Sequence, residues 1–522
     1  MTAAFAPAQS AVAHALRRVE AAPAVARAAL VAVFALVVAA PGLFALPPLD
    51  RDEARFAQAS AQMLETGDFV VIRFQEGERN KKPVGAYWLQ AASVPAFSSV
   101  EAREIWAHRL PSLVAAALAA ALTTLIGGML YGPRTGLLAG ALLAAAPGLV
   151  GEATIAKADA PLLAATLAAQ AALAALYMRA RADRPAPTAI AIGFWVAVGV
   201  GVLVKGPISL MVTGFTGLTL LIAADAPLRR RLVRATRPVA GLVVLAAVLA
   251  PWLIAIGRAT DGRFFVDAIA GDMLAKVGAA QERHGGPPGY HAALVWLLLW
   301  PAAALIPGGL RRAVAERRDW RALFLLGWLA PSWLVFELAS TKLPHYALPL
   351  YPALAILAAR AAETSAGPVA RRLGALLYAV VGVAAAGIVA AAPAMSGAAS
   401  LGADGPARVA GAVGGVGLAL ASVAIAVRFQ RGDARAATPA AILSSACLAW
   451  LLLVGVAPRL QDLTVSKQLS AAIDAAGAHH LNDLAPPSVV SGYYEPSAVF
   501  LLGTPTIMTD GAAAARAAVG PS

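Results

Sequence analysis

The sequence predicts an all-helical protein that crosses a membrane many times. Of its 522 residues, 59% are hydrophobic and only 14% are charged, and the mean hydropathy is +0.70. A soluble protein of this length has about a quarter charged residues. Apolar runs such as 28–46 and 239–257 approach the ~20 residues that a helix needs to cross the core of a bilayer. These observations favour lipid as the surroundings of most of the chain.

The first apolar run, 28–46, follows three arginines, Arg17, Arg18 and Arg27. This order is also typical of signal peptides, whose apolar region is about 7–15 residues long and precedes a small-residue cleavage site. The run is longer than that, and no cleavage site is evident before the next charged stretch. We therefore expect a retained first helix.

Reading on from that helix, we predict about thirteen membrane spans. They are expected at 28–46, 110–130, 135–150, 160–178, 187–203, 208–224, 239–257, 290–309, 321–339, 347–362, 373–394, 409–427 and 438–457. These spans make up a transmembrane domain over 1–457. The tail, 458–522, changes in character, because 486–509 combines turn residues with β-branched and aromatic runs. This pattern is typical of a small α/β domain.

Arginines are concentrated in alternate connections between the predicted spans. They occur in the N-terminal tail and in every even-numbered connection, including "RRRLVRATR" at 229–237. Cytoplasmic loops carry such an excess of basic residues. The net charge of +13 is therefore a topology signal, and nucleic acid is not expected as a partner. The single cysteine, Cys447, excludes an intrachain disulfide and a cysteine-based metal site.

The odd-numbered connections then face the opposite compartment, and two of them are long. The first, 47–109, holds two stretches with helical patterns, 51–67 and 83–97. They are expected either to lie in the membrane interface, where Trp and Tyr settle, or to pack on a core of the loop itself. The second long connection is 258–289.

Three groups of polar residues fall on this same side. The first contains Asp50, Asp52, Glu53, Arg55, Lys81 and Lys82; the second contains Lys157 and Asp159; the third contains Lys205, Asp272, Lys276, Glu282, Arg283, His284, Lys342, His345 and Tyr346. Each charge alone can be explained as a helix-end residue that extends to the interface. Together they indicate a site in which a carboxylate accepts a proton from a hydroxyl and cations hold a phosphate.

Five segments occur in an order that resembles a known family. They are "DRDEARFAQASAQMLETGDFVVIRF", "NKKPVGAYWLQ", "TIAKADAPL", "VKGP" and "STKLPHYALPLYPALAIL". They are similar to the bacterial polyprenyl-phosphate-sugar glycosyltransferases of type C, typified by the 4-amino-4-deoxy-L-arabinose lipid A transferases and related to protein O-mannosyltransferases. The resemblance covers roughly residues 30–360. It implies about thirteen transmembrane helices, periplasmic interface helices and a small periplasmic C-terminal domain.

The resemblance also implies roles for individual residues. It identifies Asp52 and Asp159 as catalytic. It assigns the donor phosphate or lipid to Arg55, Lys82, Lys205, Lys342 and Tyr346. Loop 258–289 differs from the arabinose branch, and a substrate pocket for another sugar is expected to include Glu53, Lys81, Asp272, Lys276, Glu282 and His284, although His284 beside "GGPP" can also simply order a turn.

Metal binding is left open by one departure from the family. Relatives of the arabinose type have Glu before the "KP" pair, as part of a metal site, whereas this chain has Lys81. The sequence therefore shows no required cofactor, and a bound divalent metal is doubtful although it stays open.

The activity implied is transfer of a sugar, with inversion, from a polyprenyl phosphate to lipid A or another envelope acceptor. The expected location is the bacterial inner membrane, with a monomeric chain whose active site faces the periplasm. Two alternatives stay open. A protein O-mannosyltransferase would place the sugar on polypeptide, and a lipid-linked-sugar flippase would bind the donor without transferring it.

Overall fold

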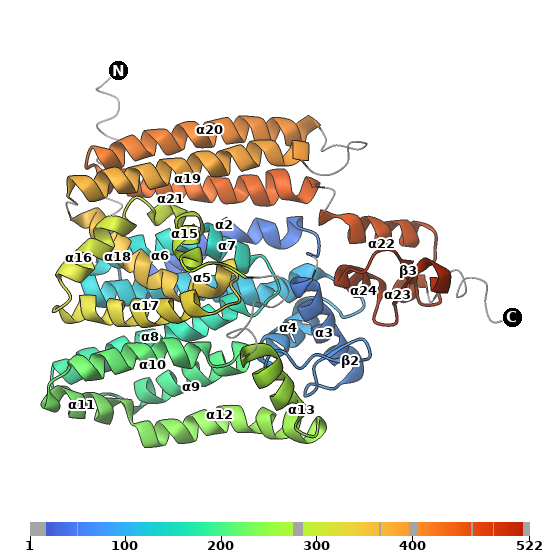
Figure 1. Ribbon diagram of the computed structural model, residues 1–522, viewed down its shortest axis with the longest axis horizontal. Coiled ribbons are helices and arrows are strands. Elements are labelled where there is room, and N and C mark those ends of the chain that lie inside the picture. The colour runs from blue at the N-terminus through green and yellow to red at the C-terminus, as the bar shows by residue number, and fades with distance from the viewer. Residues whose placement is uncertain are drawn as a thin grey trace.

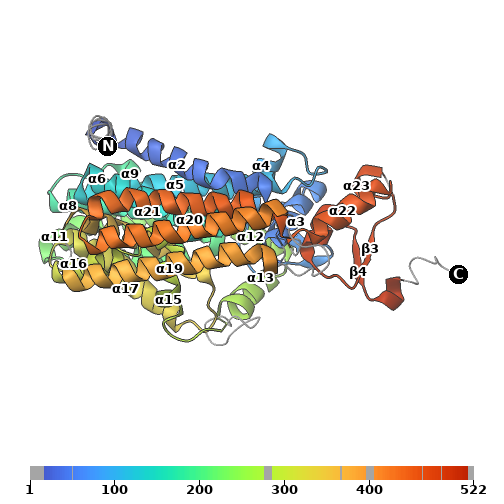
Figure 2. The ribbon, with the colours of Figure 1, turned by 90° about the horizontal axis from the view of Figure 1, so that it is seen from above.

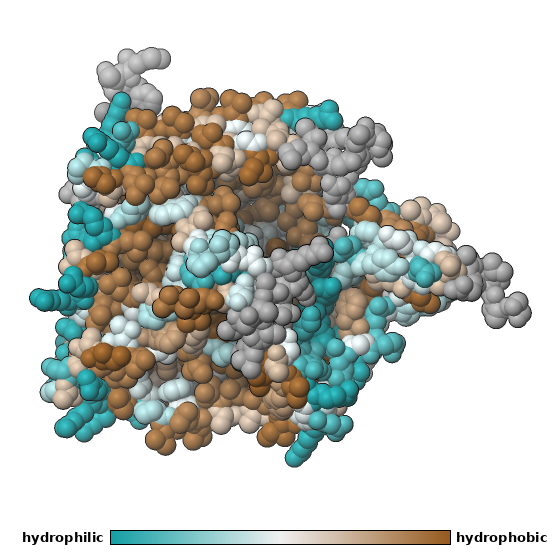
Figure 3. Space-filling view, viewed as in Figure 1, coloured by the Kyte–Doolittle hydropathy of each residue, from teal (hydrophilic) through white to brown (hydrophobic). Residues whose placement is uncertain are grey.

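A computed structural model describes residues 17–49, 51–274, 285–364, 367–395, 405–460, 463–483 and 485–514. Within these ranges, nine helices are long and apolar enough to cross a membrane, or ten if one bent pair counts as a single span. The chain is therefore a multi-pass membrane protein built mainly of helices. Figure 3 shows the apolar surface of the bundle, with hydrophilic side chains gathered toward its two ends.

The nine candidate spans are α2 (Ala24–Ala45), α5 (Ile105–Tyr131), α8 (Asp159–Arg181), α9 (Thr188–Lys205), α11 (Ala226–Thr236) with α12 (Pro238–Ala259), α17 (Trp320–Leu338), α19 (Pro368–Met395), α20 (Gly405–Gln430), and α21 (Ala434–Trp450) with η4 (Leu451–Val456) and η5 (Ala457–Arg459). Each of them overlaps a predicted span. The bent pair is α6 (Pro133–Ala144) and α7 (Pro147–Ala153), which meet at 61°.

The remaining predicted spans are shorter or broken in the structure. They correspond to α10 (Ile208–Ala223); to α15 (Tyr290–Leu298), η2 (Trp300–Ala302) and α16 (Ile306–Ala315); and to η3 (Pro344–Leu350) with α18 (Tyr351–Glu363). Proline explains the breaks, because it cannot donate the backbone hydrogen bond that continues a helix. Pro147, Pro301 and Pro307 stand at the first or second position of α7, η2 and α16.

Small residues let α5 and α6 pack closely. A Cβ atom at Gly136 would collide with the carbonyl oxygen of Thr124, and one at Gly127 would lie 3.0 Å from the Gly136 Cα. Glycine is therefore required at this contact, as is common where membrane helices approach each other.

The arginine-rich connections meet at one end of the bundle. Arg134 lies 3.8 Å from Glu20 of the N-terminal segment and 3.7 Å from Glu363 at the end of α18. Arg231 of α11 pairs with Asp183, which follows α8, at 2.9 Å. The grouping of basic connections predicted from the sequence is therefore found in space, with α11 and α16 at this end in Figures 1 and 2.

The first long loop forms a packed layer at the opposite end. It contains α3 (Asp52–Thr66), the antiparallel pair β1 (Arg73–Phe74) and β2 (Gly77–Glu78), and α4 (Gly85–Phe97). The two helices match those predicted from the pattern. Phe56 of α3 stacks on Tyr87 of α4 with ring centroids 4.8 Å apart, and both belong to a buried cluster that includes Trp252 of α12. The apolar side of α3 therefore packs on α4 and on the membrane helices.

The second long loop begins with α13 (Arg263–Phe265) and the π-helix η1 (Val266–Leu274). The tail contains α22 (Val465–Ala475), α23 (His480–Asp483), β3 (Val489–Ser491), α24 (Pro496–Leu502) and β4 (Ile507–Thr509), and β3 pairs with β4 in parallel. We refer to residues 463–514, as described, as the C-terminal unit. Figures 1 and 2 show it beside α3, at the end of the bundle that carries the first loop.

Candidate functional site

Asp159 lies at the centre of a buried network of charges. It is the first residue of α8 and is 5% exposed. Its Oδ1 accepts a hydrogen bond from the Nζ of Lys205, the last residue of α9. Its Oδ2 lies 3.8 Å from the Nζ of Lys157, in the segment between α7 and α8. Asp159 is therefore held between two lysines from different elements.

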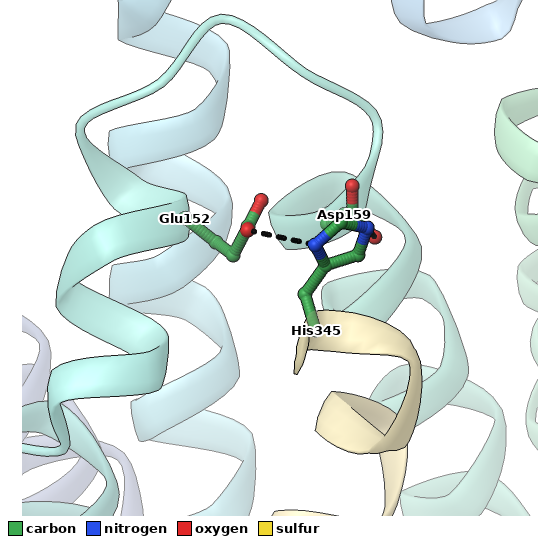
Figure 4. Close-up of side chains that lie close together, drawn as sticks. All are labelled: Glu152, Asp159 and His345. Atoms are coloured by element: carbon green, nitrogen blue, oxygen red, sulfur yellow. Dashed lines mark ion pairs between the residues drawn. The ribbon is translucent and has the colours of Figure 1, made fainter. Parts of the chain in front are cut away.

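Glu152 and His345 complete this network. The Lys157 Nζ is 3.6 Å from Oε2 of Glu152, near the end of α7. The two ring nitrogens of His345, in η3, each face a carboxylate: Nδ1 is 3.4 Å from Glu152 Oε1 and Nε2 is 3.6 Å from Asp159 Oδ1. Figure 4 shows the imidazole between the two acids. We call Glu152, Lys157, Asp159, Lys205 and His345 the charge network.

The protonation states follow from burial and from neighbouring charges. Burial lowers the pKa of His345 well below its usual value, and Lys157, Lys205 and Lys82 lower it further, although Asp159 opposes them. Burial also acts to lower the pKa of Lys157, but Glu152, Asp159 and Asp52 together outweigh it and raise that pKa. At neutral pH the network therefore contains a neutral imidazole and a charged Lys157.

Glu152, Asp159 and His345 offer ligand atoms that all lie within 4.8 Å of one another. Such a set of donors can bind zinc. Here, however, Lys157 contacts both acids and Lys205 contacts Asp159. A divalent cation would enter a space in which two ammonium groups already neutralise the two carboxylates. The arrangement fits an ion-pair network better than a metal site.

Asp52, which is expected from the sequence to be catalytic, is exposed to solvent. It is the first residue of α3 and follows Arg51 with its positive φ of 63°. Its charge acts on Lys157, so it adjoins the network. Arg55, one turn further along α3, is partly exposed.

A cavity of about 560 Å³ opens beside the network. Its wall is mostly apolar and is contributed by α9, α12, α13, α17 and η1, through residues that include Leu253, Phe264, Ile269 and Phe336. Its cationic rim consists of Lys81, Lys82 and Lys205, with Tyr346. The Lys205 Nζ lies 5.4 Å from the centre of the Tyr346 ring. A molecule with an anionic head and an apolar tail matches this combination.

Glu53 does not face the cavity, although it was expected in a substrate pocket. It is 1% exposed, and its two carboxylate oxygens accept hydrogen bonds from Arg109 Nε at 2.8 Å and Nη2 at 2.7 Å. The backbone N–H groups of Leu49 and Ala156 also donate to it, at 2.7 and 2.8 Å. Its acceptors are thus used within the protein.

Lys342 has internal partners as well. Its Nζ donates to the carbonyl oxygens of Gly286 and Ala339, at 2.9 and 2.7 Å. Asp272 lies on η1, and only its backbone is described, while Lys276, Glu282 and His284 lie outside the described residues. Asp159 thus pairs with Lys205, which lines the cavity together with Lys81, Lys82 and Tyr346. Asp52 is related to this site through its electrostatic effect on Lys157.

Glu152 is the residue that the sequence reasoning missed. It stands five residues before Lys157 in "GEATIAK", and no periodicity marks it. Its signal is a carboxylate within an apolar region, which is costly unless it has a partner. Lys157 and His345 were noticed in the sequence without a role being assigned to them.

The chain is similar in sequence and in fold to known proteins. Residues 26–262 match the model of the dolichyl-phosphate-mannose-protein mannosyltransferase family. The structure aligns with ArnT from Cupriavidus metallidurans bound to undecaprenyl phosphate, with a TM-score of 0.72 and 23% identity over 92% of this chain and 86% of that chain. This chain therefore has the same fold as that protein. The predicted resemblance is confirmed.

Curated proteins with similar sequences are undecaprenyl phosphate-alpha-4-amino-4-deoxy-L-arabinose arabinosyl transferases. The protein from Enterobacter sp. (strain 638) is 29% identical over 59% of this chain and 54% of its own length. The one from Aeromonas salmonicida (strain A449) is 30% identical over 61% of this chain and 58% of its own length. The match therefore spans little more than half the length of these relatives. An oligosaccharyltransferase from Archaeoglobus fulgidus aligns more distantly, with a TM-score of 0.52 and 12% identity over 93% of this chain and 64% of that chain.

Proposed function

We propose that this protein is an integral membrane glycosyltransferase that takes a sugar from a polyprenyl phosphate donor. The observation that carries the proposal is the cavity with an apolar wall and a cationic rim, whose Lys205 pairs with Asp159. The rim suits the phosphate and the wall suits the start of the lipid tail. The names of the curated relatives, which include undecaprenyl phosphate, support this class of donor.

The reaction we propose is an inverting transfer, and the placement of the charges supports it. An acceptor oxygen attacks the anomeric carbon from the side opposite the phosphate, so the new C–O bond forms as the bond to the phosphate oxygen breaks and the configuration inverts. Asp52, which is exposed, takes the proton of the acceptor hydroxyl. Lys82 and Lys205 stabilise the negative charge that grows on the departing phosphate, with Arg55, Tyr346 and Lys342 as further candidates for donor contacts. Asp159 holds Lys205 in place.

The topology that goes with this activity is a set of thirteen crossings in the bacterial inner membrane, completed by the shorter helices α10, α15 with α16, and α18. The arginine-rich end faces the cytoplasm. The active site, the first loop 47–109, loop 258–289 and a C-terminal domain at 458–522 then face the periplasm, and 1–457 form the transferase domain. The acceptor is lipid A or another envelope glycolipid, and the protein acts as a monomer.

The test is transfer of radiolabelled sugar from undecaprenyl phosphate to lipid A by the purified protein in nanodiscs. We expect Asp52→Asn to lower turnover by at least about 100-fold, because general base catalysis contributes on the order of 10²–10⁴, while donor binding persists. Glu76→Gln, an exposed acid of the same loop, is the matched control and should keep wild-type turnover. Full turnover by Asp52→Asn would refute the assigned base, and binding of the donor without transfer to any acceptor would favour a flippase.

The mannosyltransferase family match favours one further acceptor. In that case the sugar would pass to a hydroxyl of a polypeptide. The same assay distinguishes the two, because the label is recovered in the lipid fraction for a glycolipid acceptor and in the protein fraction for a polypeptide.

A further inference from the structure

The segment 154–158, between α7 and α8, carries Lys157 and leads directly into Asp159. It is not helical, so no regular hydrogen bonding fixes its backbone. Thr154, Ala156 and Ala158 are nevertheless 2%, 0% and 1% exposed. Buried backbone groups need partners, and those of this segment determine where Lys157 and Asp159 lie.

Both backbone groups of Ala156 are bound by side chains of the first loop. Its N–H donates to Glu53 Oε1 of α3 at 2.8 Å, and its carbonyl oxygen accepts from Gln90 Nε2 of α4 at 3.2 Å. Gln90 is in turn bound by the hydroxyl of Ser60, at 3.1 Å. Ala156 is therefore fixed along its hydrogen-bonding directions by α3 and α4.

The third constraint comes from the C-terminal unit. Ala156 belongs to a small buried cluster with Ala57, Ile105 and Phe500. Phe500 lies in α24 and is 0% exposed. Its ring packs edge-on against His108 with centroids 5.3 Å apart. An aromatic ring from near the end of the chain thus packs directly behind the segment that carries Lys157.

Phe500 is held in this place by polar contacts between the residues that follow α24 and the first loop. Gln75 donates to the carbonyl oxygens of Thr504 and Thr506, at 3.0 and 2.6 Å. The hydroxyl of Thr504 donates to Glu65 at 2.6 Å and accepts from Gln58 at 2.7 Å. These contacts connect the C-terminal unit to the first loop and restrict movement of Phe500 away from Ala156.

We infer that Phe500 is a positioning residue, through which the C-terminal unit sets the placement of Lys157 and Asp159. The inference rests on the proposed function, because it concerns the transfer step at that site. Phe500 contacts no part of the donor cavity. Its effect should therefore fall on turnover and not on donor binding. Without the ring, Ala156 faces a void, the segment can shift toward it, and the lysine and aspartate move with the backbone.

The experiment compares Phe500→Ala with Val499→Ala in the full-length protein in nanodiscs. Val499 is also 0% exposed and lies on the same helix, but it is outside the Ala156 cluster, so it controls for general loss of packing. We expect Phe500→Ala to lower kcat at least tenfold with the KM for the donor within twofold. Val499→Ala should keep kcat, and Phe500→Leu should recover most of it. If Phe500→Ala does not fold, Phe500→Leu is expected to show a smaller loss of the same kind.

Hydrogen exchange of the peptide that contains 154–158 tests the inference independently of activity. Exchange should be slow in wild type and in Val499→Ala and faster in Phe500→Ala. Unchanged exchange and unchanged kcat in Phe500→Ala would overturn the inference, as would an equal loss of kcat in Val499→Ala. Absence of transfer by the wild-type protein would instead count against the proposed function, and the exchange result would still decide whether Phe500 positions this segment.

Discussion

A buried ion pair, Glu53–Arg109, lies close to the charge network, and the two differ in how completely their polar atoms are hydrogen-bonded. The Glu53–Arg109 pair is 1% and 0% exposed at its side chains. Arg109 donates to Glu53 and to the carbonyl oxygens of Leu43, Leu46 and Pro47, while Glu53 also accepts from two backbone N–H groups. This pair is internally satisfied.

The charge network around Asp159 is less complete. Glu152 Oε2 is buried without a hydrogen bond from the described residues, and its nearest cation, Lys157, is at 3.6 Å. Lys205 belongs both to the network and to the rim of the cavity. Burial is therefore common to both groups of charges. They differ in the incomplete hydrogen bonding of Glu152 and in the position of Lys205 on the cavity rim.

The largest effect is expected from breaking the satisfied pair. Glu53→Gln should lower stability by about 3–5 kcal/mol, because it leaves the Arg109 charge buried without compensation. Thermal unfolding in detergent, followed by size-exclusion chromatography, measures this loss. Glu65→Gln is the matched control, since the Glu65–Arg103 pair is partly exposed, and it should cost less. Wild-type stability in Glu53→Gln would show that the pair is not structural.

The next effect concerns the network and should appear in activity more than in stability. Lys205→Met removes a cation that contacts Asp159 and faces the cavity. Loss of one such stabilising group costs on the order of 10²–10³ in kcat. Donor binding, measured by competition with undecaprenyl phosphate, should weaken as well. Lys81→Gln, which changes an exposed rim residue, should have a smaller effect. Equal losses in both variants would contradict the special place of Lys205.

The smallest expected effect is on the pH dependence of stability. The folded pKa of His345 lies below its usual value of 6.5, so the unfolded chain binds a proton that the folded chain does not. The contribution of His345 is therefore a stability loss that begins as pH falls below about 6.5, with a slope of roughly 1 kcal/mol per pH unit. Thermal unfolding should be measured between pH 5 and 8, at about unit steps. Below about pH 6.5, the stability of His345→Gln should fall less steeply with pH than that of the wild-type protein. An identical pH dependence in both proteins would mean that the pKa of His345 is the same in the folded and unfolded states, and would contradict the lowered folded pKa.

The sequence predicted the architecture well where one pattern dominates. Long apolar runs located the candidate spans, and the helical spacing in 51–67 and 83–97 matches α3 and α4. The sequence predicted helix continuity less well in apolar runs that contain proline. The runs at 135–150 and 290–309 each contain proline and are divided in the structure, because an apolar run does not reveal whether its helix is continuous.

The sequence named most residues of the candidate site, but it did not predict which way their side chains point or which partners they contact. Asp52 and Glu53 are neighbours in the sequence, yet one is exposed and the other buried, since successive residues of a helix point about 100° apart. Which of the two faces the site depends on Arg109, more than fifty residues away along the chain. The pairing of Glu152 with His345 depends likewise on a tertiary contact that no local spacing encodes.

The position of Phe500 has a consequence for biosynthesis. In a chain of 522 residues, every predicted membrane span is translated and inserted before this ring leaves the ribosome. The helices, the cavity and both aspartates can thus be in the membrane while the segment behind Lys157 still lacks one of its three supports. If Phe500 positions this segment as we infer, a chain that still lacks the C-terminal unit would have the proposed donor site in the membrane before Lys157 and Asp159 are fully positioned.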